Sequence, residues 1–447
     1  MLSSKGYSVL KKKVNVEKVI NDLTVKPTDG FIQNTEDTSF CVCMETSKSL
    51  YVPKYYGLQT FGLPKTNKIT EPDKVSLSFK GNLLDAQHDP VKVYLDCARD
   101  PLKMGGILQL PPGAGKTVMA LYILCQLGVK TMIIVHKEFL LNQWKERIEQ
   151  YIPHATIGMI KQSMVQVDCD IAIASLQSLS MKEYPVDTFS KFGLVIIDEC
   201  HHIAAQVFSK ALLKVNFKYA LGLSATVTRK DGLSKVFKWF IGDIVYKVAK
   251  KKDVDCNVDI AIFEHEDTQY SKEVHMFNGK INMAKMVNNL TTFEPRTDYI
   301  IDKLFDTINN EPTRNVIVLS DRRQHLEDMK KKIDERRTNN GDILTTGLYL
   351  GGMKNDILEL SKEKQVILGT FNMVSEGFDL PKLDTLILAT SKSDIEQSVG
   401  RIQRKHSYGK DDNIPLIIDI VDNFSIFGNQ HKKRNAFYKK MKYNIIK

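Results

Sequence analysis

The sequence predicts an α/β fold with two lobes, each built on a parallel β-sheet. Short apolar runs alternate with amphipathic helical stretches, which is typical of a parallel sheet covered by helices on both faces. This alternation occurs twice, and a more polar, less regular stretch separates the two halves. The 447 residues allow two or three domains, each large enough for its own core.

The pattern divides the chain into four parts. Residues 1–80 have mixed, partly β character, and we expect a small accessory domain there. We expect the first lobe over residues 81–249, an inter-lobe connection over residues 250–292, and the second lobe over residues 293–447. The predicted buried strands are Gly105–Leu110, Thr131–His136, Asp170–Ser175, Leu194–Asp198 and Tyr219–Thr226 in the first lobe, and Asn315–Ser320, Gln365–Thr370, Asp384–Ala389 and Pro415–Val421 in the second.

The composition indicates a globular protein that is neither secreted nor inserted in a membrane. No apolar run approaches the roughly 18 residues that cross a bilayer, and the N-terminus lacks the apolar core of a secretion signal. The seven cysteines are scattered without a C-x-x-C pair, which favours reduced thiols in an intracellular protein. Cys41 and Cys43 would share one face of a strand, but no second pair of ligands for a zinc site is near.

The net charge of +10 and the pI of about 9.0 favour a polyanionic partner, nucleic acid before membrane. On charge alone, a soluble basic protein without such a partner is an equal alternative. The segment His431–Lys447 contains seven Lys or Arg residues and no acid. It predicts either a basic helix that stacks aromatic side chains on nucleic acid or a terminal helix that packs them on the second lobe.

A glycine-rich loop, LPPGAGKT, lies between a predicted strand and a predicted helix. Backbone N–H groups of such a loop surround nucleotide phosphates. We expect Lys116 to reach the β- and γ-phosphates and Thr117 to ligate Mg²⁺, so ATP and Mg²⁺ are the expected cofactors. The predicted nucleotide contacts in the loop are Pro112, Gly113, Ala114, Gly115, Lys116 and Thr117.

An acidic pair, Asp198 and Glu199, stands at the end of the predicted strand Leu194–Asp198. We expect Asp198 to hold Mg²⁺ and Glu199 to orient the attacking water. Alone, the pair would equally suit the N-terminus of the next helix, but the glycine-rich loop favours the catalytic reading. We expect His201 to couple this site to Ser224, Ala225 and Thr226 by hydrogen bonding.

A third motif, QSVGRIQR, lies in the predicted second lobe. We expect Arg401 and Arg404 one turn apart on a helix, where both can face the same phosphate. Arginines from a second lobe neutralise charge on the γ-phosphoryl group and make hydrolysis depend on lobe closure. A solvated basic helix face is the alternative. Gln397 is a further predicted nucleotide contact.

Together and in this order, the motifs over residues 81–447 resemble those of superfamily 2 DExH-box helicases, whose two lobes are RecA-like. The resemblance implies an ATP-driven motor that grips the nucleic-acid backbone across both lobes. It places Gln87 at the adenine, although Asp85 and Ala86 replace the Arg and Tyr of that family element. It also places Gly377 and Asp379 near the ribose and phosphates. The nucleic-acid contacts that it implies are Gln143, Ser175, Gln177, Ser320 and Thr370.

Trp144 follows Gln143 directly and has helical spacing from Leu140 and Leu141, which predicts packing rather than stacking on a base.

Two details resemble narrower groups. The glycine-rich loop and Leu221–Gly232 resemble a branch that mostly acts on DNA, which holds the excision-repair and phage recombination helicases. Leu50–Gly62 and Asp422–Tyr443 resemble the transcript-release DNA helicases of poxviruses and related large cytoplasmic DNA viruses. These resemblances imply that DNA is preferred to RNA. They also imply RNA polymerase or another transcription protein as a partner, and the host cytoplasm or virion as the location. A monomer is compatible with the sequence. The expected role is transcript release in viral transcription, or DNA repair or recombination. An RNA helicase and a partner-dependent transcription factor with ATPase activity but no unwinding are the alternatives.

Overall fold

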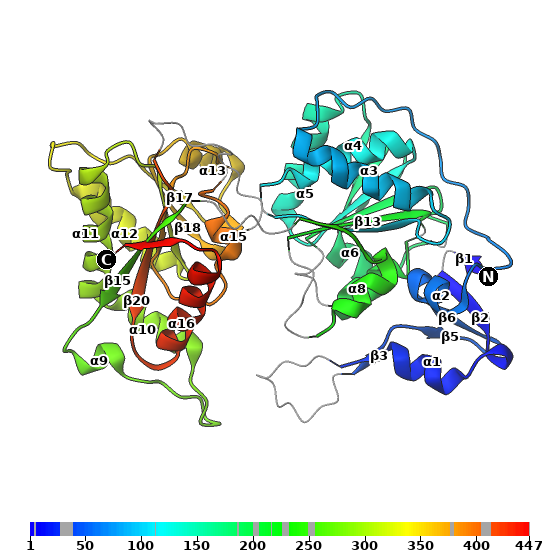
Figure 1. Cartoon of the computed structure of the whole chain (residues 1–447), viewed down its shortest axis with the longest axis horizontal. Coiled ribbons are helices and arrows are strands. Elements are labelled where there is room, and N and C mark those ends of the chain that lie inside the picture. The colour runs from blue at the N-terminus through cyan, green and yellow to red at the C-terminus, as the bar shows by residue number, and fades with distance from the viewer. Residues whose placement is uncertain are drawn as a thin grey trace. The chain divides into compact units, whose positions relative to one another are not determined.

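The computed structural model describes the chain except for residues 4–5, 27–38, 112, 186, 200–204, 216, 226–231, 249–254, 376–379, 404–412 and 447. The chain divides into two compact units, Met1–Ala249 and Lys250–Lys447 (Figure 1). Among the described residues, no helix is long and apolar enough to cross a membrane. Each unit is built around its own large β-sheet, so the predicted α/β class with two parallel-sheet lobes is confirmed.

The first unit contains an eight-stranded sheet in the order β10-β9-β11-β8-β12-β13-β7-β14. Its strand neighbours run parallel except for β10 and β9. The five predicted strands are present within two residues of their expected bounds. The strands are β7 (Gly105–Gln109), β8 (Thr131–Val135), β9 (Ile157–Lys161), β10 (Met164–Val165), β11 (Ile171–Ser175), β12 (Leu194–Asp198), β13 (Tyr219–Ser224) and β14 (Ile244–Lys247).

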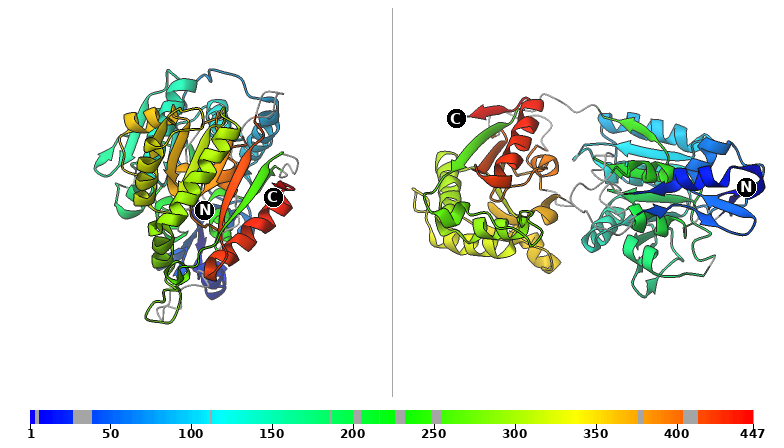
Figure 2. Two further views of the ribbon diagram at one scale, coloured as in Figure 1. Left: turned by 90° about the vertical axis from the view of Figure 1, so that its left-hand side faces the viewer. Right: turned by 90° about the horizontal axis from the view of Figure 1, so that it is seen from below.

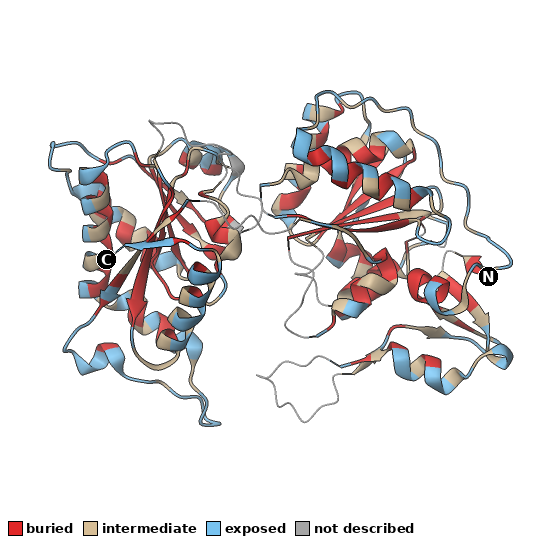
Figure 3. Ribbon diagram, in the orientation of Figure 1, coloured by how far each residue is buried: buried red, intermediate tan, exposed pale blue. Residues whose placement is uncertain are grey.

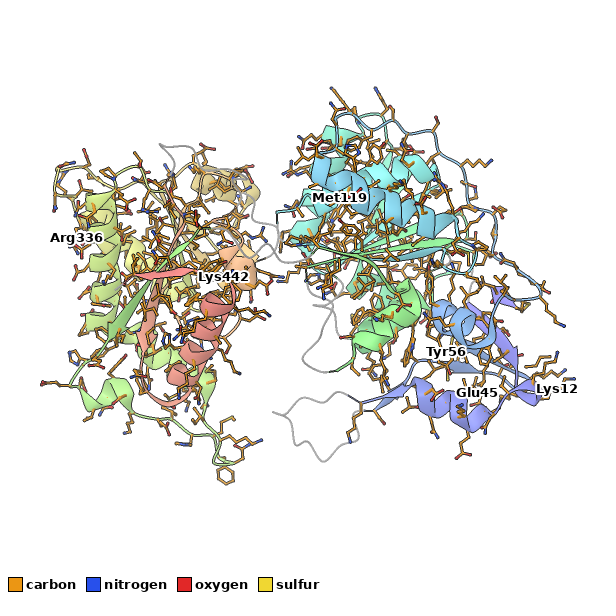
Figure 4. All side chains as sticks on the ribbon, viewed as in Figure 1. Lys12, Glu45, Tyr56, Met119, Arg336 and Lys442 are labelled. Atoms are coloured by element: carbon orange, nitrogen blue, oxygen red, sulfur yellow. The ribbon has the colours of Figure 1, made fainter. Side chains whose placement is uncertain are left out.

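Helices cover both faces of this sheet, because successive side chains of each strand point to opposite sides. On β7, Ile107 packs in one apolar cluster and Leu108 in the other. Figure 3 shows the central strands as almost wholly buried. One face is covered by α3 (Asp85–Arg99), α4 (Lys116–Leu127) and α5 (Glu138–Tyr151), and the other by α6 (Leu176–Met181), α7 (Ala205–Leu212) and α8 (Ser234–Ile241). In Figure 4, Met119 marks α4, where its side chain is buried against the sheet.

The N-terminal segment packs onto the first sheet's helical layer within the same compact unit. The Tyr55 hydroxyl donates to the Met104 carbonyl at 2.9 Å, and the Tyr56 ring meets the Trp239 ring of α8 at 5.8 Å. The segment therefore shares a hydrophobic core with the first lobe. Its elements are β1 (Leu2–Ser3), β2 (Gly6–Leu10), a 3₁₀ turn (Lys11–Lys13), α1 (Val16–Leu23), β3 (Thr24–Val25), β4 (Phe40–Cys41), β5 (Met44–Glu45), β6 (Ser49–Val52) and α2 (Lys54–Phe61).

Cys41 and Cys43 lie on one side of the chain, as their spacing predicts, with the Sγ atoms 2.9 Å apart. Val42 between them is buried. The described residues contain no group of three His, Cys, Asp or Glu side chains that could hold a metal ion.

The second unit contains a seven-stranded sheet in the order β17-β18-β16-β19-β20-β15-β21, and all its described neighbours are parallel. The four predicted strands are present. The strands are β15 (Asn257–Phe263), β16 (Val316–Ser320), β17 (Thr346–Tyr349), β18 (Val366–Thr370), β19 (Thr385–Leu388), β20 (Leu416–Asp422) and β21 (Asn444–Ile446).

The predicted inter-lobe connection over residues 250–292 needs correction. Residues 257–263 form β15, which pairs with β20 along its whole length. On its other side β15 is paired with β21 only over Asn257–Asp259. The polar residues Asn257 and Asp259 lie in this paired half, whereas the unpaired half is apolar and includes Ile262, which is half exposed. This mixed character hid the strand in the sequence, and the segment belongs to the second lobe.

Helices also cover both faces of the second sheet. Figure 2 shows α11 and α12 on one face and α16 on the other. In α16, the Tyr438 side chain is buried and its hydroxyl donates to Asp419 at 3.1 Å, whereas Lys442, just after the helix, is exposed (Figure 4). The structure therefore favours packing of the terminal aromatic side chains over stacking on nucleic acid. The helices are α9 (Thr268–Ser271), α10 (Met283–Thr292), α11 (Glu294–Asn310), α12 (Arg323–Glu335), α13 (Asn355–Lys362), α14 (Phe371–Ser375), α15 (Glu396–Val399) and α16 (Ser425–Lys440).

Candidate nucleotide-binding active site

The glycine-rich loop joins β7 to α4 at the carboxyl edge of the first sheet. Gly113 and Gly115 have φ angles of 79° and 77°, in the left-handed region that favours glycine. The backbone N–H of Leu110 donates to the carbonyl of Ser224 at 2.9 Å, which fixes the start of the loop on the neighbouring strand. The first turn of α4 then supplies N–H groups and the positive end of a helix dipole, both of which favour a phosphate. Pro112 lies outside the described residues.

Gln87 supports this loop from α3. Its amide oxygen accepts from the Leu84 N–H, and its amide nitrogen donates to the Ala114 carbonyl, both at 3.0 Å. A Cβ atom on Gly115 would lie 2.2 Å from that nitrogen, so the contact requires glycine at this position. The side chain is buried beside the loop, where the resemblance expects it, and its contact with adenine stays a prediction.

Lys116 and Glu199 form an ion pair, with Nζ and Oε1 2.7 Å apart. Both side chains are mostly buried, at 13% and 16% exposure. Glu199 has a φ angle of 47°, an uncommon backbone conformation for a residue with a side chain. The structure therefore brings the predicted phosphate-binding cation and the predicted water-orienting carboxylate into direct contact.

Asp198 ends β12 and is 9% exposed. Burial and then the charge of Glu199 raise the pKa of Asp198 to about 6, although Lys116 and a hydrogen bond from Trp144 oppose the shift. That hydrogen bond runs from the indole Nε1–H to Asp198 Oδ2 at 3.0 Å. Trp144 is buried, so its predicted packing role is confirmed. Its polar contact was missed, because the two residues are 54 positions apart in sequence.

Ser224 ends β13, which lies between β12 and β7 in the sheet. Its side chain is fully buried. The side-chain amide of Gln109 reaches the carbonyl of Ala225 at 3.5 Å. These two coupling candidates thus contact the strand that precedes the glycine-rich loop and neighbour the strand of Asp198. Thr226 and His201 lie outside the described residues.

The oxygen atoms at this edge fit a magnesium ion. Thr117 offers a hydroxyl in the first turn of α4, and Asp198 a carboxylate, the kinds of ligand that Mg²⁺ prefers together with substrate phosphates. Burial and the neighbouring charge of Glu199 raise the pKa of Asp198, so a nearby cation would stabilise its charged form. A bound ion would supply this positive charge and neutralise the phosphates.

Three predicted nucleic-acid contacts lie in the first unit. Gln177 is exposed, and its amide nitrogen donates to the His136 carbonyl at 2.7 Å. The Ser175 hydroxyl donates to the amide oxygen of Gln177 at 3.2 Å. Ser175 ends β11 and His136 follows β8, which are neighbouring strands, so these segments meet at the carboxyl edge of the sheet. Gln143 lies on α5, partly exposed.

The other two predicted nucleic-acid contacts end neighbouring strands of the second sheet. Thr370 is partly exposed. Ser320 is fully buried: its Oγ lies 3.1 Å from His325 Nδ1 and accepts the Arg322 N–H at 3.2 Å. The predicted contact of the Ser320 side chain with nucleic acid therefore needs correction, because this hydroxyl is turned into the core.

The predicted helix through Arg401 is shorter than expected. Gln397 lies in α15, which ends at Val399. Arg401 follows in a turn, and its backbone N–H donates to the Ser398 carbonyl. Both side chains are partly exposed. The predicted sites Arg404, Gly377 and Asp379 lie outside the described residues.

Comparison with known proteins agrees with this geometry. Residues 80–229 match the family described as type III restriction enzyme, res subunit, and residues 296–409 match the helicase conserved C-terminal domain. A putative ATP-dependent RNA helicase of Acanthamoeba polyphaga mimivirus is 33% identical over 460 residues, which cover 99% of this chain and 85% of that protein. The chain belongs to the superfamily 2 helicases. As a helicase it is an ATP-hydrolysing enzyme.

Further relatives of this helicase are viral. A putative helicase of Invertebrate iridescent virus 6 is 28% identical and matches over 96% of this chain and 97% of its own. A probable helicase of Escherichia phage T5 is 27% identical over 75% of this chain and 70% of its own. Among solved structures, a Saccharomyces cerevisiae Dbp5 variant bound to RNA and ADP BeF3 shares the fold with a TM-score of 0.53 at 12% identity, over 82% of this chain and 94% of that one.

Proposed function

We propose that this helicase is a DNA motor that uses ATP and Mg²⁺ and serves transcription by releasing transcripts. The observation that carries its ATP chemistry is the contact between Lys116 and Glu199 at the carboxyl edge of the first sheet, next to the buried Asp198. A phosphate-binding cation, a water-orienting carboxylate and a metal-binding carboxylate at one strand end are the groups that phosphoryl transfer requires.

The ion pair suggests how nucleotide binding prepares the site. In this structure Lys116 is bonded to Glu199. A γ-phosphate at the first turn of α4 would compete for the lysine, since it carries more negative charge than a carboxylate. Glu199 would then be released to accept a hydrogen bond from the attacking water. Binding of ATP would thus itself activate the general base.

Nucleic acid would act on the same sheet edge. The Ser175–Gln177–His136 hydrogen bonds lie at the ends of β11 and β8, and β8 is the direct neighbour of β12, which ends at Asp198. A nucleic-acid strand bound at this edge would therefore contact segments next to β12, the strand that ends at Asp198. This arrangement supports ATP hydrolysis that depends on nucleic acid.

DNA is favoured over RNA by the branch resemblance of the glycine-rich loop and of Leu221–Gly232, and transcript release by the resemblance of the two terminal segments. A host-cell location, with the virion as a second site, follows from the same resemblance. An RNA helicase is the second candidate, because the mimiviral relative is named an RNA helicase and the Dbp5 structure contains RNA. The residues of the nucleotide site are compatible with both a DNA helicase and an RNA helicase. Only the kind of nucleic acid that stimulates ATP hydrolysis distinguishes the two.

The test is ATP hydrolysis by the purified protein without nucleic acid and with single-stranded DNA, duplex DNA or single-stranded RNA. We expect stimulation by DNA and little by RNA, with no activity in Lys116→Ala. Equal or greater stimulation by RNA would refute the DNA assignment. If DNA stimulates, release of labelled RNA from a stalled transcription complex then tests the role in transcription, and retention of the RNA would refute it.

A further inference from the structure

Trp144 is a residue of α5, the helix that follows β8, and its side chain reaches the end of β12. Its side chain is 1% exposed, and its indole Nε1–H donates to Asp198 Oδ2 at 3.0 Å. An indole offers one donor and no acceptor, so this contact engages one defined carboxylate oxygen and leaves Oδ1 for other partners. A hydrogen bond to a charged acceptor in a buried place is among the stronger ones in proteins.

The bond acts on a carboxylate that needs support. Asp198 is buried beside the like charge of Glu199, and Lys116 already pairs with Glu199. Partners that hydrogen-bond a metal-binding side chain fix its orientation, and their loss typically lowers metal affinity by roughly 10- to 100-fold. Among the described hydrogen bonds, the indole N–H of Trp144 is the one that Asp198 receives from α5.

We propose that Trp144 is a positioning residue, which holds Asp198 in the orientation that binds Mg²⁺–nucleotide and makes that orientation depend on α5. The inference rests on the proposed role of Asp198 in the nucleotide site. The proposal assigns Trp144 a role in Mg²⁺–nucleotide binding in addition to its packing in the core.

The dependence on α5 follows from where the helix begins. It starts at Glu138, directly after the segment whose His136 carbonyl accepts the hydrogen bond from the exposed Gln177. Gln143, a predicted nucleic-acid contact, is the neighbour of Trp144 in the chain. A nucleic-acid strand that displaces the His136 segment or α5 would move the indole of Trp144, and with it the side chain of Asp198.

The competing explanation is that Trp144 only fills the core with Leu140, Leu141 and Ile148. Two substitutions separate the explanations. Trp144→Phe keeps an aromatic ring and removes the N–H donor, whereas Ile148→Val thins the same core one turn later on the same helix and leaves the donor in place. The readout is binding of a fluorescent ADP analogue as Mg²⁺ is titrated, which needs no turnover.

We expect Trp144→Phe to raise the Mg²⁺ concentration at half-maximal binding by about 10- to 100-fold, with unchanged affinity for the nucleotide without Mg²⁺. Ile148→Val should match the wild type. An unchanged Mg²⁺ requirement in Trp144→Phe, or an equal shift in Ile148→Val, would overturn the positioning role. Absence of any binding by the wild-type protein would instead refute the proposed nucleotide site, and this inference with it.

A second measurement keeps Trp144 intact. The chain has two tryptophans, and Trp239 of α8 packs in the cluster on the opposite face of the sheet. With ¹⁵N-labelled tryptophan, the protein should give two indole N–H signals, which Trp239→Phe assigns. We expect the Trp144 signal to shift on addition of Mg²⁺ and ADP while the Trp239 signal stays. An unchanged chemical shift of the Trp144 indole signal on addition of Mg²⁺ and ADP would contradict the proposal.

Discussion

The two sheets both bury aspartates on central strands, but they compensate the charge in different ways. In the second unit, Asp422 receives two hydrogen bonds from the fully buried Arg296, at 2.7 and 2.8 Å. Asp419 is bonded by the equally buried Arg434. In the first unit, Asp198 receives an indole N–H at 3.0 Å, while the nearby Lys116 is bonded to Glu199.

The pKa shifts follow this difference. Burial opposes ionisation of Asp419, but the hydrogen bonds and charges of His431 and Arg434 outweigh burial and lower its pKa. Burial and Glu199 raise the pKa of Asp198 to about 6, and nothing outweighs them. The buried charges of the second unit are therefore paired and stabilise its structure. The first unit instead keeps a carboxylate whose charged form is disfavoured, at the place where Mg²⁺–nucleotide is proposed to bind.

The largest effect is expected from breaking a buried pair of the second unit. Arg296→Leu leaves the buried Asp422 carboxyl group without its guanidinium partner, which should destabilise that unit by about 3–5 kcal/mol. Both tryptophans lie in the first unit, so their fluorescence reports on that unit alone during urea unfolding, whereas circular dichroism reports on both. We expect an earlier dichroism transition and an unchanged fluorescence transition.

The control is Arg323→Leu. Arg323 pairs with Glu327 on an exposed face of α12 and is 58% exposed, so its loss should cost under about 0.5 kcal/mol. Equal losses in Arg296→Leu and Arg323→Leu would contradict the structural role of the buried pair.

The next effect concerns catalysis in the first unit. Glu199→Gln keeps the size of the side chain but removes the proposed general base, and we expect turnover of ATP to fall by about 10²–10⁴-fold. Affinity for ATP should be kept or improved, because Lys116 loses a competing anion. Steady-state hydrolysis and equilibrium nucleotide binding check both expectations. Turnover near that of the wild type would remove the role assigned to Glu199.

Substitution of Asp198 should stabilise the first unit, in contrast to the destabilisation expected from Arg296→Leu in the second, and the effect should be smaller. Asp198→Asn retains an oxygen that accepts the Trp144 N–H and removes the strained charge. Because the folded-state pKa lies above the unfolded one, the charge costs stability in full above pH 6, and most of this cost is lost by pH 4. We expect the tryptophan-monitored transition at pH 8 to gain up to about 3 kcal/mol, with a gain of less than about 1 kcal/mol at pH 4. A loss of stability at pH 8 would contradict this account.

The smallest effect is a pH dependence in the second unit. Burial and then the charge of Arg296 lower the pKa of His325 to about 3. The unfolded chain takes up a proton near pH 6.5 and the folded one does not, so stability falls as the pH drops below 6.5. This should cost about 2 kcal/mol at pH 5. His325→Gln should reduce the difference between urea midpoints at pH 5 and 7.5, and an unchanged difference would refute the assignment.

Sequence patterns were sufficient for the fold because they are local. Runs such as Leu194–Ile197 are apolar throughout, as is typical of strands buried on both faces, and the glycine-rich loop marks the sheet edge at which the nucleotide is expected to bind. β15 was missed because the half-buried polar residues Asn257 and Asp259 interrupt its apolar residues, so it lacks the continuous apolar run of the central strands.

Contacts between distant residues could not be predicted. The Trp144–Asp198 bond and the Arg296–Asp422 pair join residues 54 and 126 positions apart, and neither partner shows by its identity which residue it will meet. The same limit applies to Ser320. A serine at the end of a strand can face solvent or the core, and its contact with His325 could not be predicted from the sequence.

The most direct test of the central claim, that the nucleotide binds at the edge of the first sheet through Lys116, is calorimetric titration of Mg²⁺–ATP into Glu199→Gln and into the double variant Lys116→Ala/Glu199→Gln. Because Glu199→Gln should not hydrolyse ATP, binding is measured without turnover. We predict one nucleotide bound by Glu199→Gln and none by the double variant. Equal binding by both proteins would contradict the account.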